Sequence, residues 1–79
     1  MDLFDLCNAS KDKASFLEYI EALKNDFISN PETWVNISIY MYLDAIHSWI
    51  SDYHQDAINF ENPGWKDIAA MLYMGKIYE

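Results

Sequence analysis

The C-terminal segment of this 79-residue chain, residues 62–79, most constrains what the chain can fold into. From Trp65 onward it is apolar at nearly every position, and the only charged interruptions are Lys66, Asp67, Lys76 and Glu79. A helix on the surface of a globular protein has one polar face, so a helix that is apolar around its circumference must be surrounded. We therefore expect this segment to lie between other helices of its own chain or against a second molecule.

A first long helix is predicted over residues 13–28. Asp12 precedes it and is a residue type that caps helix N-termini. Apolar side chains then follow at spacings of three and four residues, which is the period of a helix with one buried face. Leu17 and Tyr19 widen this stripe on its two sides. The central members of the stripe are Phe16, Ile20, Leu23 and Phe27.

Asn30 and Pro31 end this helix, because proline lacks an N–H group and the residue before a proline avoids helical dihedral angles. Pro31 suits the first position of a new helix, so we expect a one-turn helix near residues 31–34 with Trp34 turned inward. Asp2 is expected to cap a short helical turn at the N-terminus.

A second long helix is predicted over residues 38–53, with Asn36 or Ser38 as its cap. Met41 stands among the polar positions of this helix. Its broad apolar stripe consists of Ile39, Tyr42, Leu43, Ile46, Trp49, Ile50 and Tyr53.

The third long helix is predicted over residues 63–78, with Pro63 at its first position and Lys76 near the negative end of its dipole. Gly75 lies inside this helix and costs about 1 kcal/mol relative to alanine there, which indicates close packing at that position. The predicted fold is a single all-α domain over residues 1–79, a small antiparallel bundle in which the third helix lies between the other two.

The chain is acidic, with thirteen aspartates and glutamates, five lysines and no arginine, and a formal net charge of −8. Such a surface repels nucleic acid and anionic membranes and attracts a basic protein partner. The start Met1-Asp2-Leu3-Phe4-Asp5 has no secretory signal pattern, and the single Cys7 fits a reducing compartment. We therefore expect a cytoplasmic protein.

Few residues offer chemistry. Asp44, His47 and His54 are the only grouping that resembles a metal site, but His47 and His54 lie about 10 Å apart along a helix, too far for one ion. Cys7 has acidic and apolar neighbours, which do not activate a thiol, so we expect it to be a small buried residue. We expect no enzymatic activity, no cofactor and no metal.

The three tryptophans allow two interpretations. Trp34, Trp49 and Trp65 can line a ligand pocket, or they can enlarge the core of a small helical domain. We favour the core, because a domain of this size needs bulky side chains to bury enough surface.

Several residues together resemble a family of short, acidic bacterial proteins that is known only as a domain of unknown function. The resemblance runs from about residue 12 to the end of the chain. It implies an all-helical fold and a bacterial origin, and it carries over no activity. The residues that support it are Phe16-Leu17, Leu23, Trp34, Trp49-Ile50, Trp65, Ile68-Ala69, Leu72 and Lys76-Ile77-Tyr78-Glu79.

Two functions are consistent with these features. The first is a non-catalytic module that binds a basic protein partner, for example an immunity or antitoxin-type inhibitor. The residues expected to bind the partner are Glu18, Glu21, Tyr40, Met41, Asp44, Asp52 and Asp56. The alternative is a self-associating structural domain that forms a homodimer. Its expected contacts are Met71, Met74, Ile77 and Tyr78.

Overall fold

The computed structural model describes residues 1–52 and 61–79, and these residues contain helices and no strand. The predicted all-α class, the short N-terminal helix and the three long helices are confirmed. In chain order the elements are α1 (Leu3–Asn8), α2 (Lys13–Ser29), the 3-10 helix η1 (Pro31–Thr33), α3 (Ile39–Asp52) and α4 (Trp65–Ile77).

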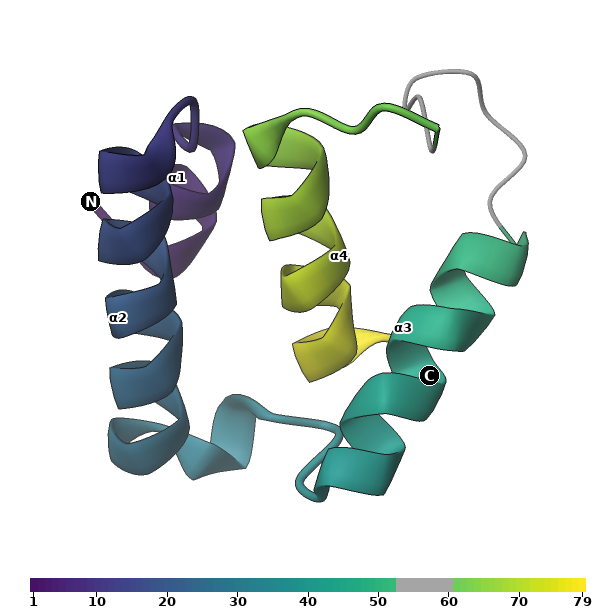
Figure 1. Cartoon of the computed structure of the whole chain (residues 1–79). Helices are drawn as coiled ribbons and strands as arrows, with labels where there is room; N and C mark the ends of the chain where they lie inside the picture. The colour runs from purple at the N-terminus through teal and green to yellow at the C-terminus, as the bar shows by residue number, and fades with distance from the viewer. Residues whose placement is uncertain (53–60) are drawn as a thin grey trace.

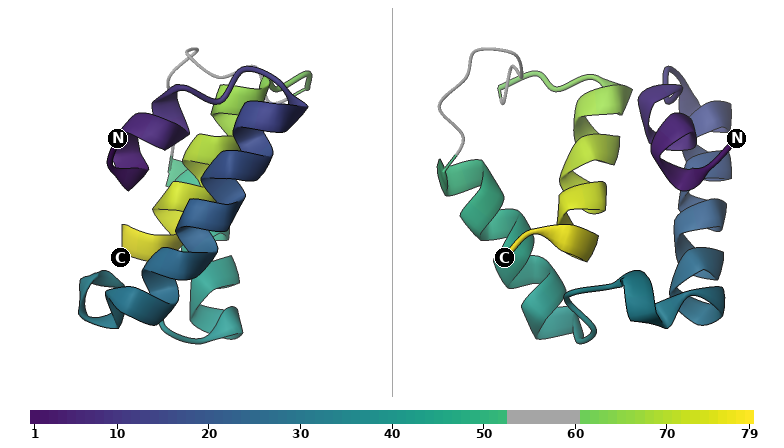
Figure 2. Two further views of the ribbon diagram at one scale, coloured as in Figure 1. Left: turned by 90° about the vertical axis from the view of Figure 1, so that its left-hand side faces the viewer. Right: turned by 180° about the vertical axis from the view of Figure 1, so that it is seen from behind.

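The three long helices lie side by side, with α4 between α2 and α3 (Figure 1). The direction of α4 is opposite to that of α3 and the same as that of α2. The short α1 packs against α2 and α4 on one face of this layer, and the C-terminal residues lie on the same side (Figure 2). The expectation that the apolar C-terminal helix lies between the other two is confirmed.

Hydrogen bonds at the helix starts agree with most of the predicted caps. A carboxylate oxygen of Asp2 accepts a bond of 2.8 Å from the N–H of Asp5, and one of Asp12 accepts a bond of 2.8 Å from the N–H of Ser15. At α3 the hydroxyl of Ser38 accepts the N–H of Met41 at 3.1 Å. Of the two residues considered for this cap, Ser38 is therefore the one that starts α3.

The start of α4 differs from the sequence prediction. Gly64 is the N-cap, and its N–H donates to the carboxylate of Asp67 at 2.9 Å. The helix therefore begins at Trp65, and Pro63 precedes it instead of occupying its first position. At the end of α3, the predicted residue Tyr53 lies outside the described residues.

The core lies where α1, α2 and α4 meet. Cys7, Tyr19, Leu23 and Ala69 are buried there, and the Tyr19 hydroxyl donates a hydrogen bond of 2.8 Å to the carbonyl of Ala69. Tyr19 is fully buried, although the sequence placed it at the edge of its stripe. Side chains that pack partly buried around this cluster are Leu3, Leu6, Phe16, Ile20, Trp34, Leu72 and Tyr73.

On its other side α4 packs closely against α3. A Cβ atom at Gly75 would lie 2.6 Å from a ring carbon of Tyr42, so only glycine fits this approach without displacing the ring. The Tyr42 hydroxyl donates a hydrogen bond of 2.7 Å to the carbonyl of Leu72. The predicted close packing at Gly75 is therefore confirmed.

Some residues of the predicted apolar stripes face outward. Leu17 is 55% exposed, Leu43 is 56% exposed and Ile39 is 73% exposed. On α3 the buried position is Ala45, which lies three residues after Tyr42 on the side that meets α4. Successive helical residues are turned by about 100°, so Leu43 points away from this contact. The stripe on α3 is wider than the surface that α4 covers.

Candidate partner-binding surfaces

A partly buried ion pair joins α2 to the end of α4. The ammonium of Lys76 lies 2.7 Å from a carboxylate oxygen of Asp26, and the two side chains are 9% and 17% exposed. The indole N–H of Trp34 donates to the same oxygen at 2.9 Å, and the Lys76 ammonium lies 5.7 Å from the centre of the Trp34 ring. We call Lys76, Asp26 and Trp34 the junction.

The electrostatics of the junction favour a charged Asp26. Burial alone would raise the pKa of Asp26, but hydrogen bonds from Lys76, Asn30 and Trp34 outweigh burial and hold this pKa below its ordinary value. Sequence analysis explained Lys76 by the helix dipole, because the spacing of 50 residues between it and Asp26 gives no periodic signal.

Residues 35 and 36 are bound to the C-terminal end of α4. The carbonyl of Lys76 accepts the N–H groups of Val35 at 3.0 Å and of Asn36 at 3.4 Å. The side-chain amide of the buried Asn36 donates to the carbonyls of Gly75 at 3.0 Å and Tyr78 at 2.9 Å. These bonds pair carbonyls that a helix end leaves without intrahelical partners. They also bring the segment before α3 beside the C-terminal residues.

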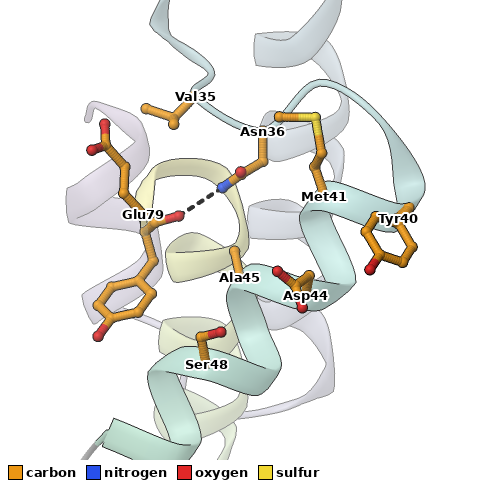
Figure 3. Close-up of a pocket in the computed structure, with 9 residues that line it drawn as sticks. Val35, Asn36, Tyr40, Met41, Asp44, Ala45, Ser48 and Glu79 are labelled. Carbon is orange, nitrogen blue, oxygen red and sulfur yellow. Dashed lines mark hydrogen bonds between the residues drawn. The ribbon is translucent and has the colours of Figure 1, made fainter.

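A cavity of about 280 Å³ lies beside this contact and is called the acidic notch (Figure 3). Asp44 and Glu79 are the acidic residues of its lining, and no lysine lines it. Asp44 and Ser48 approach it from α3, while Val35 and Asn36 border it from the preceding segment (Figure 3). Its lining consists of Val35, Asn36, Tyr40, Met41, Asp44, Ala45, Ser48, Tyr78 and Glu79.

The structure brings together three of the seven residues predicted to bind a partner, Tyr40, Met41 and Asp44, all in the acidic notch. Asp52 is further along α3, where its carboxylate accepts the hydroxyl of Tyr78 at 2.5 Å. This hydrogen bond raises the pKa of Tyr78.

The other predicted acids lie apart from the notch. Glu18 and Glu21 are exposed on α2, which is on the far side of α4 from α3 (Figure 1). Glu21 lies 3.4 Å from Lys24 in an exposed ion pair. Asp56 lies outside the described residues.

A second surface feature, the apolar groove, was not predicted from the sequence. It consists of two adjoining cavities of about 350 and 290 Å³ between α2 and the start of α3, which share Phe27, Trp34 and Tyr42. One cavity is also lined by Ile20, Leu23, Lys24 and Ile28, and the other by Asn36, Ile37, Ser38 and Ile39.

The sequence did contain a signal for this groove. Ile37 and Ile39 are apolar residues in and just after a connecting segment, where polar residues are usual. They are 64% and 73% exposed. The tryptophans were expected either to enlarge the core or to line a pocket. Trp34 does both, because it packs partly buried against the core cluster and also lines the groove.

The candidate chemical groups can be placed in part. Asp44 and His47 are exposed on α3, and His54 lies outside the described residues. Within residues 1–52 and 61–79, no three His, Cys, Asp or Glu side chains are grouped so that they can hold a metal ion. Cys7 is buried as predicted, and this burial raises the pKa of its thiol. In the same described residues, no helix has the length and apolar character needed to cross a membrane.

The four residues of the predicted dimer contact are partly covered by their own chain. Met71, Met74 and Tyr78 have intermediate exposure, and Ile77 is 38% exposed. Self-association through these residues remains a prediction.

The layer of helices, the junction and the two surface features define a small all-α protein. Within this class, the chain belongs to a family of unknown function (DUF7660), whose model matches residues 12–79. The resemblance to a domain of unknown function, from about residue 12 to the end of the chain, is thereby confirmed, and α1 lies before the matched region. Comparison with curated proteins and with solved structures gave no match.

Proposed function

We propose that this chain is a non-catalytic protein-binding module whose acidic notch accepts a lysine or arginine side chain of a basic partner. The observation that carries this proposal is the lining of the notch. It combines the acidic residues Asp44 and Glu79 with the apolar surfaces of Tyr40 and Met41 and contains no cationic residue.

Each part of this lining suits one part of a basic side chain. The alkyl stem of a lysine or arginine packs on apolar groups such as Met41 and Tyr40 while its charged end stays in a polar setting. Hydrogen bonds between a charged donor and a carboxylate are roughly twice as strong as neutral ones. The formal net charge of −8 adds long-range attraction, which speeds encounter with a basic partner at low salt.

An inhibitor that covers a basic surface, as an immunity protein or an antitoxin does, is the form of this function that we favour. The module would act in the bacterial cytoplasm, in keeping with its single cysteine and acidic surface. The surface that it covers is expected to contain lysine or arginine. The notch would recognise such a side chain by its positive charge and its shape, without catalysing a reaction.

A lysine hexapeptide is a defined probe for this proposal. We expect the peptide to bind at low ionic strength and to shift the backbone NMR signals of residues 40–48. Asp44→Asn is expected to weaken binding about three- to tenfold, because it removes one charge-assisted bond. Glu18→Gln is the matched control, since it changes the net charge by the same amount at an exposed position outside the notch.

Two results would reject the notch as the binding site. One is an equal loss of affinity in both variants, which would indicate attraction by net charge alone. The other is binding that does not weaken as salt is added, because screening reduces contacts between exposed charges.

A further inference from the structure

We infer that the apolar groove is an interface for a second copy of this chain, related to the first by a two-fold axis. The groove opens away from the acidic notch, although Asn36 borders both. On α2, Ala22, Asn25 and Ser29 lie toward α1, whereas the groove is lined by Ile20, Phe27 and Ile28. At about 100° per residue these sets lie on different sides of the helix. The C-terminal residues of the notch lie on the α1 side (Figure 2).

The groove face contains both a projection and a hollow. Ile28 and Ile39 are each 73% exposed and Ile37 is 64% exposed, so their side chains project from the rims. Between them Trp34 and Tyr42, both partly buried, line the hollow. A two-fold interface uses the same patch on both copies, and the patch must therefore be complementary to itself. Isoleucines beside an apolar hollow meet this requirement.

Charge favours a second copy over a basic partner at this face. None of the described acidic residues lines the groove, and its one charged residue, Lys24, lies near Glu21. Two copies with a formal charge of −8 each can therefore approach here without opposing carboxylates. A basic segment in the groove would find no carboxylate in the lining with which to pair.

The exposed area suits a weak dimer. The exposed large apolar residues of the groove are Phe27, Ile28, Ile37 and Ile39. Each exposes on the order of 100 Å², so together they provide about 400 Å² per copy. Two copies would then bury about 800 Å², an area typical of weak, transient contacts. We therefore expect a dimer whose population depends on concentration in the micromolar range, with both acidic notches open to solvent.

Sedimentation velocity of the full chain from about 10 µM to about 500 µM tests this inference. We expect the average mass to rise toward that of a dimer. Ile39→Glu and Ile28→Lys should each weaken the dimer at least about tenfold, because they bury a charge in the interface. Both new charges are favourable for the helix dipole. Ile39 is at the N-terminus of α3, where an acidic side chain is stabilising, and Ile28 is in the last turn of α2, where a basic side chain is stabilising.

Phe4→Glu is the control, because Phe4 is a 57% exposed apolar residue of α1, outside the groove and on the other face of the layer. This variant should dimerise like the unchanged chain. Added salt should strengthen the dimer, because it screens repulsion between two acidic copies, and should weaken binding of the lysine peptide. The two proposals can therefore fail separately.

Three outcomes would overturn the inference. A monomer throughout the concentration range would remove the dimer. A dimer that survives both Ile39→Glu and Ile28→Lys would place the interface elsewhere. Loss of the dimer in Ile77→Glu, with Ile39→Glu unaffected, would assign it to the C-terminal residues that were predicted from the sequence.

Discussion

The two faces of the helical layer differ in chemistry: one has paired polar groups and acidic residues, and the other has exposed apolar side chains. On the face that carries α1, the carbonyls at the end of α4 are bonded by Val35 and Asn36, and acidic groups surround a notch. On the opposite face, isoleucines remain exposed around a groove with almost no charge. The short segment between η1 and α3 contributes residues to both. A short loop between two helices can thus contribute to two surfaces of different chemistry.

Both faces depend on the junction. Trp34 lines the groove, while the carbonyl of Lys76 binds the segment that borders the notch. Changes at the junction should therefore affect both faces, and a change at Ile39 should affect mainly the groove.

The largest expected effect comes from Lys76→Met. Removing one partner of a buried ion pair costs about 3–5 kcal/mol. The remaining Asp26 side chain is 17% exposed. Asp26 is only partly buried and keeps hydrogen bonds from Trp34 and Asn30, so we expect a loss near the lower end of that range. Urea unfolding measures the loss. Lys24→Met, which breaks an exposed ion pair, should cost no more than about 1 kcal/mol, and similar losses in both variants would contradict a special role for the junction.

Acid should weaken the same junction. Because the pKa of Asp26 is lowered in the folded protein, its stabilising contribution is fully present above its unfolded pKa of about 3.9. The contribution is lost as the pH falls below that value and through the lower folded pKa. Unfolding free energies measured between about pH 5 and pH 2 should fall more steeply for the unchanged chain than for Asp26→Asn. Parallel pH profiles would show that Asp26 does not titrate as described.

Gly75→Ala should destabilise the contact between α4 and α3. Alanine favours a helix by about 1 kcal/mol over glycine, but the new methyl would lie 2.6 Å from the Tyr42 ring. We expect a net loss of about 1–3 kcal/mol, as in other overpacked sites. In a Tyr42→Ala background the same change should be neutral or stabilising. An increase in stability in the unchanged background would mean that the ring moves away without cost.

Asn36→Ala should affect the notch more than the groove. The variant loses two hydrogen bonds to the end of α4, which is expected to cost about 1–2 kcal/mol. Binding of the lysine peptide should weaken because the notch loses its border. Dimerisation should weaken by less, because Asn36 also lines only one of the two cavities of the groove. Equal losses in the peptide titration and in sedimentation would show that the two faces are not separable.

Ile39→Glu should have the smallest effect on the folded monomer. Its side chain is 73% exposed, and surface substitutions of this kind usually change stability by less than about 0.5 kcal/mol. Thermal unfolding at low micromolar concentration, where the chain is monomeric, checks this value. A loss of several kcal/mol would mean that Ile39 is packed within its own chain.

Much of the fold could be predicted from local sequence. The caps Asp2 and Asp12, the break at Pro31 and the all-round apolar C-terminal segment each act within a few residues, and each led to a correct element. The central position of α4 followed from the need to surround such a helix.

The parts that sequence analysis missed depend on contacts between distant residues. The helical period of a sequence predicts the direction of each side chain around its helix. It does not predict which residues of a broad apolar stripe contact the neighbouring helix. Ala45 is buried and Leu43 is exposed because Tyr42 and Gly75 bring α3 and α4 close at one point. For the same reason, the junction could be recognised only after α2 and α4 were placed side by side, and the groove only after the start of α3 was placed beside α2.

The most direct test of the account is a single NMR sample of the labelled full chain studied in two ways. Dilution should shift signals of groove residues such as Ile28 and Ile39, and the lysine peptide should shift signals of notch residues such as Met41 and Asp44. The account predicts two separate sets of residues on opposite faces of the layer. A single set that responds to both treatments would contradict the division of the molecule into an acidic face and an apolar face.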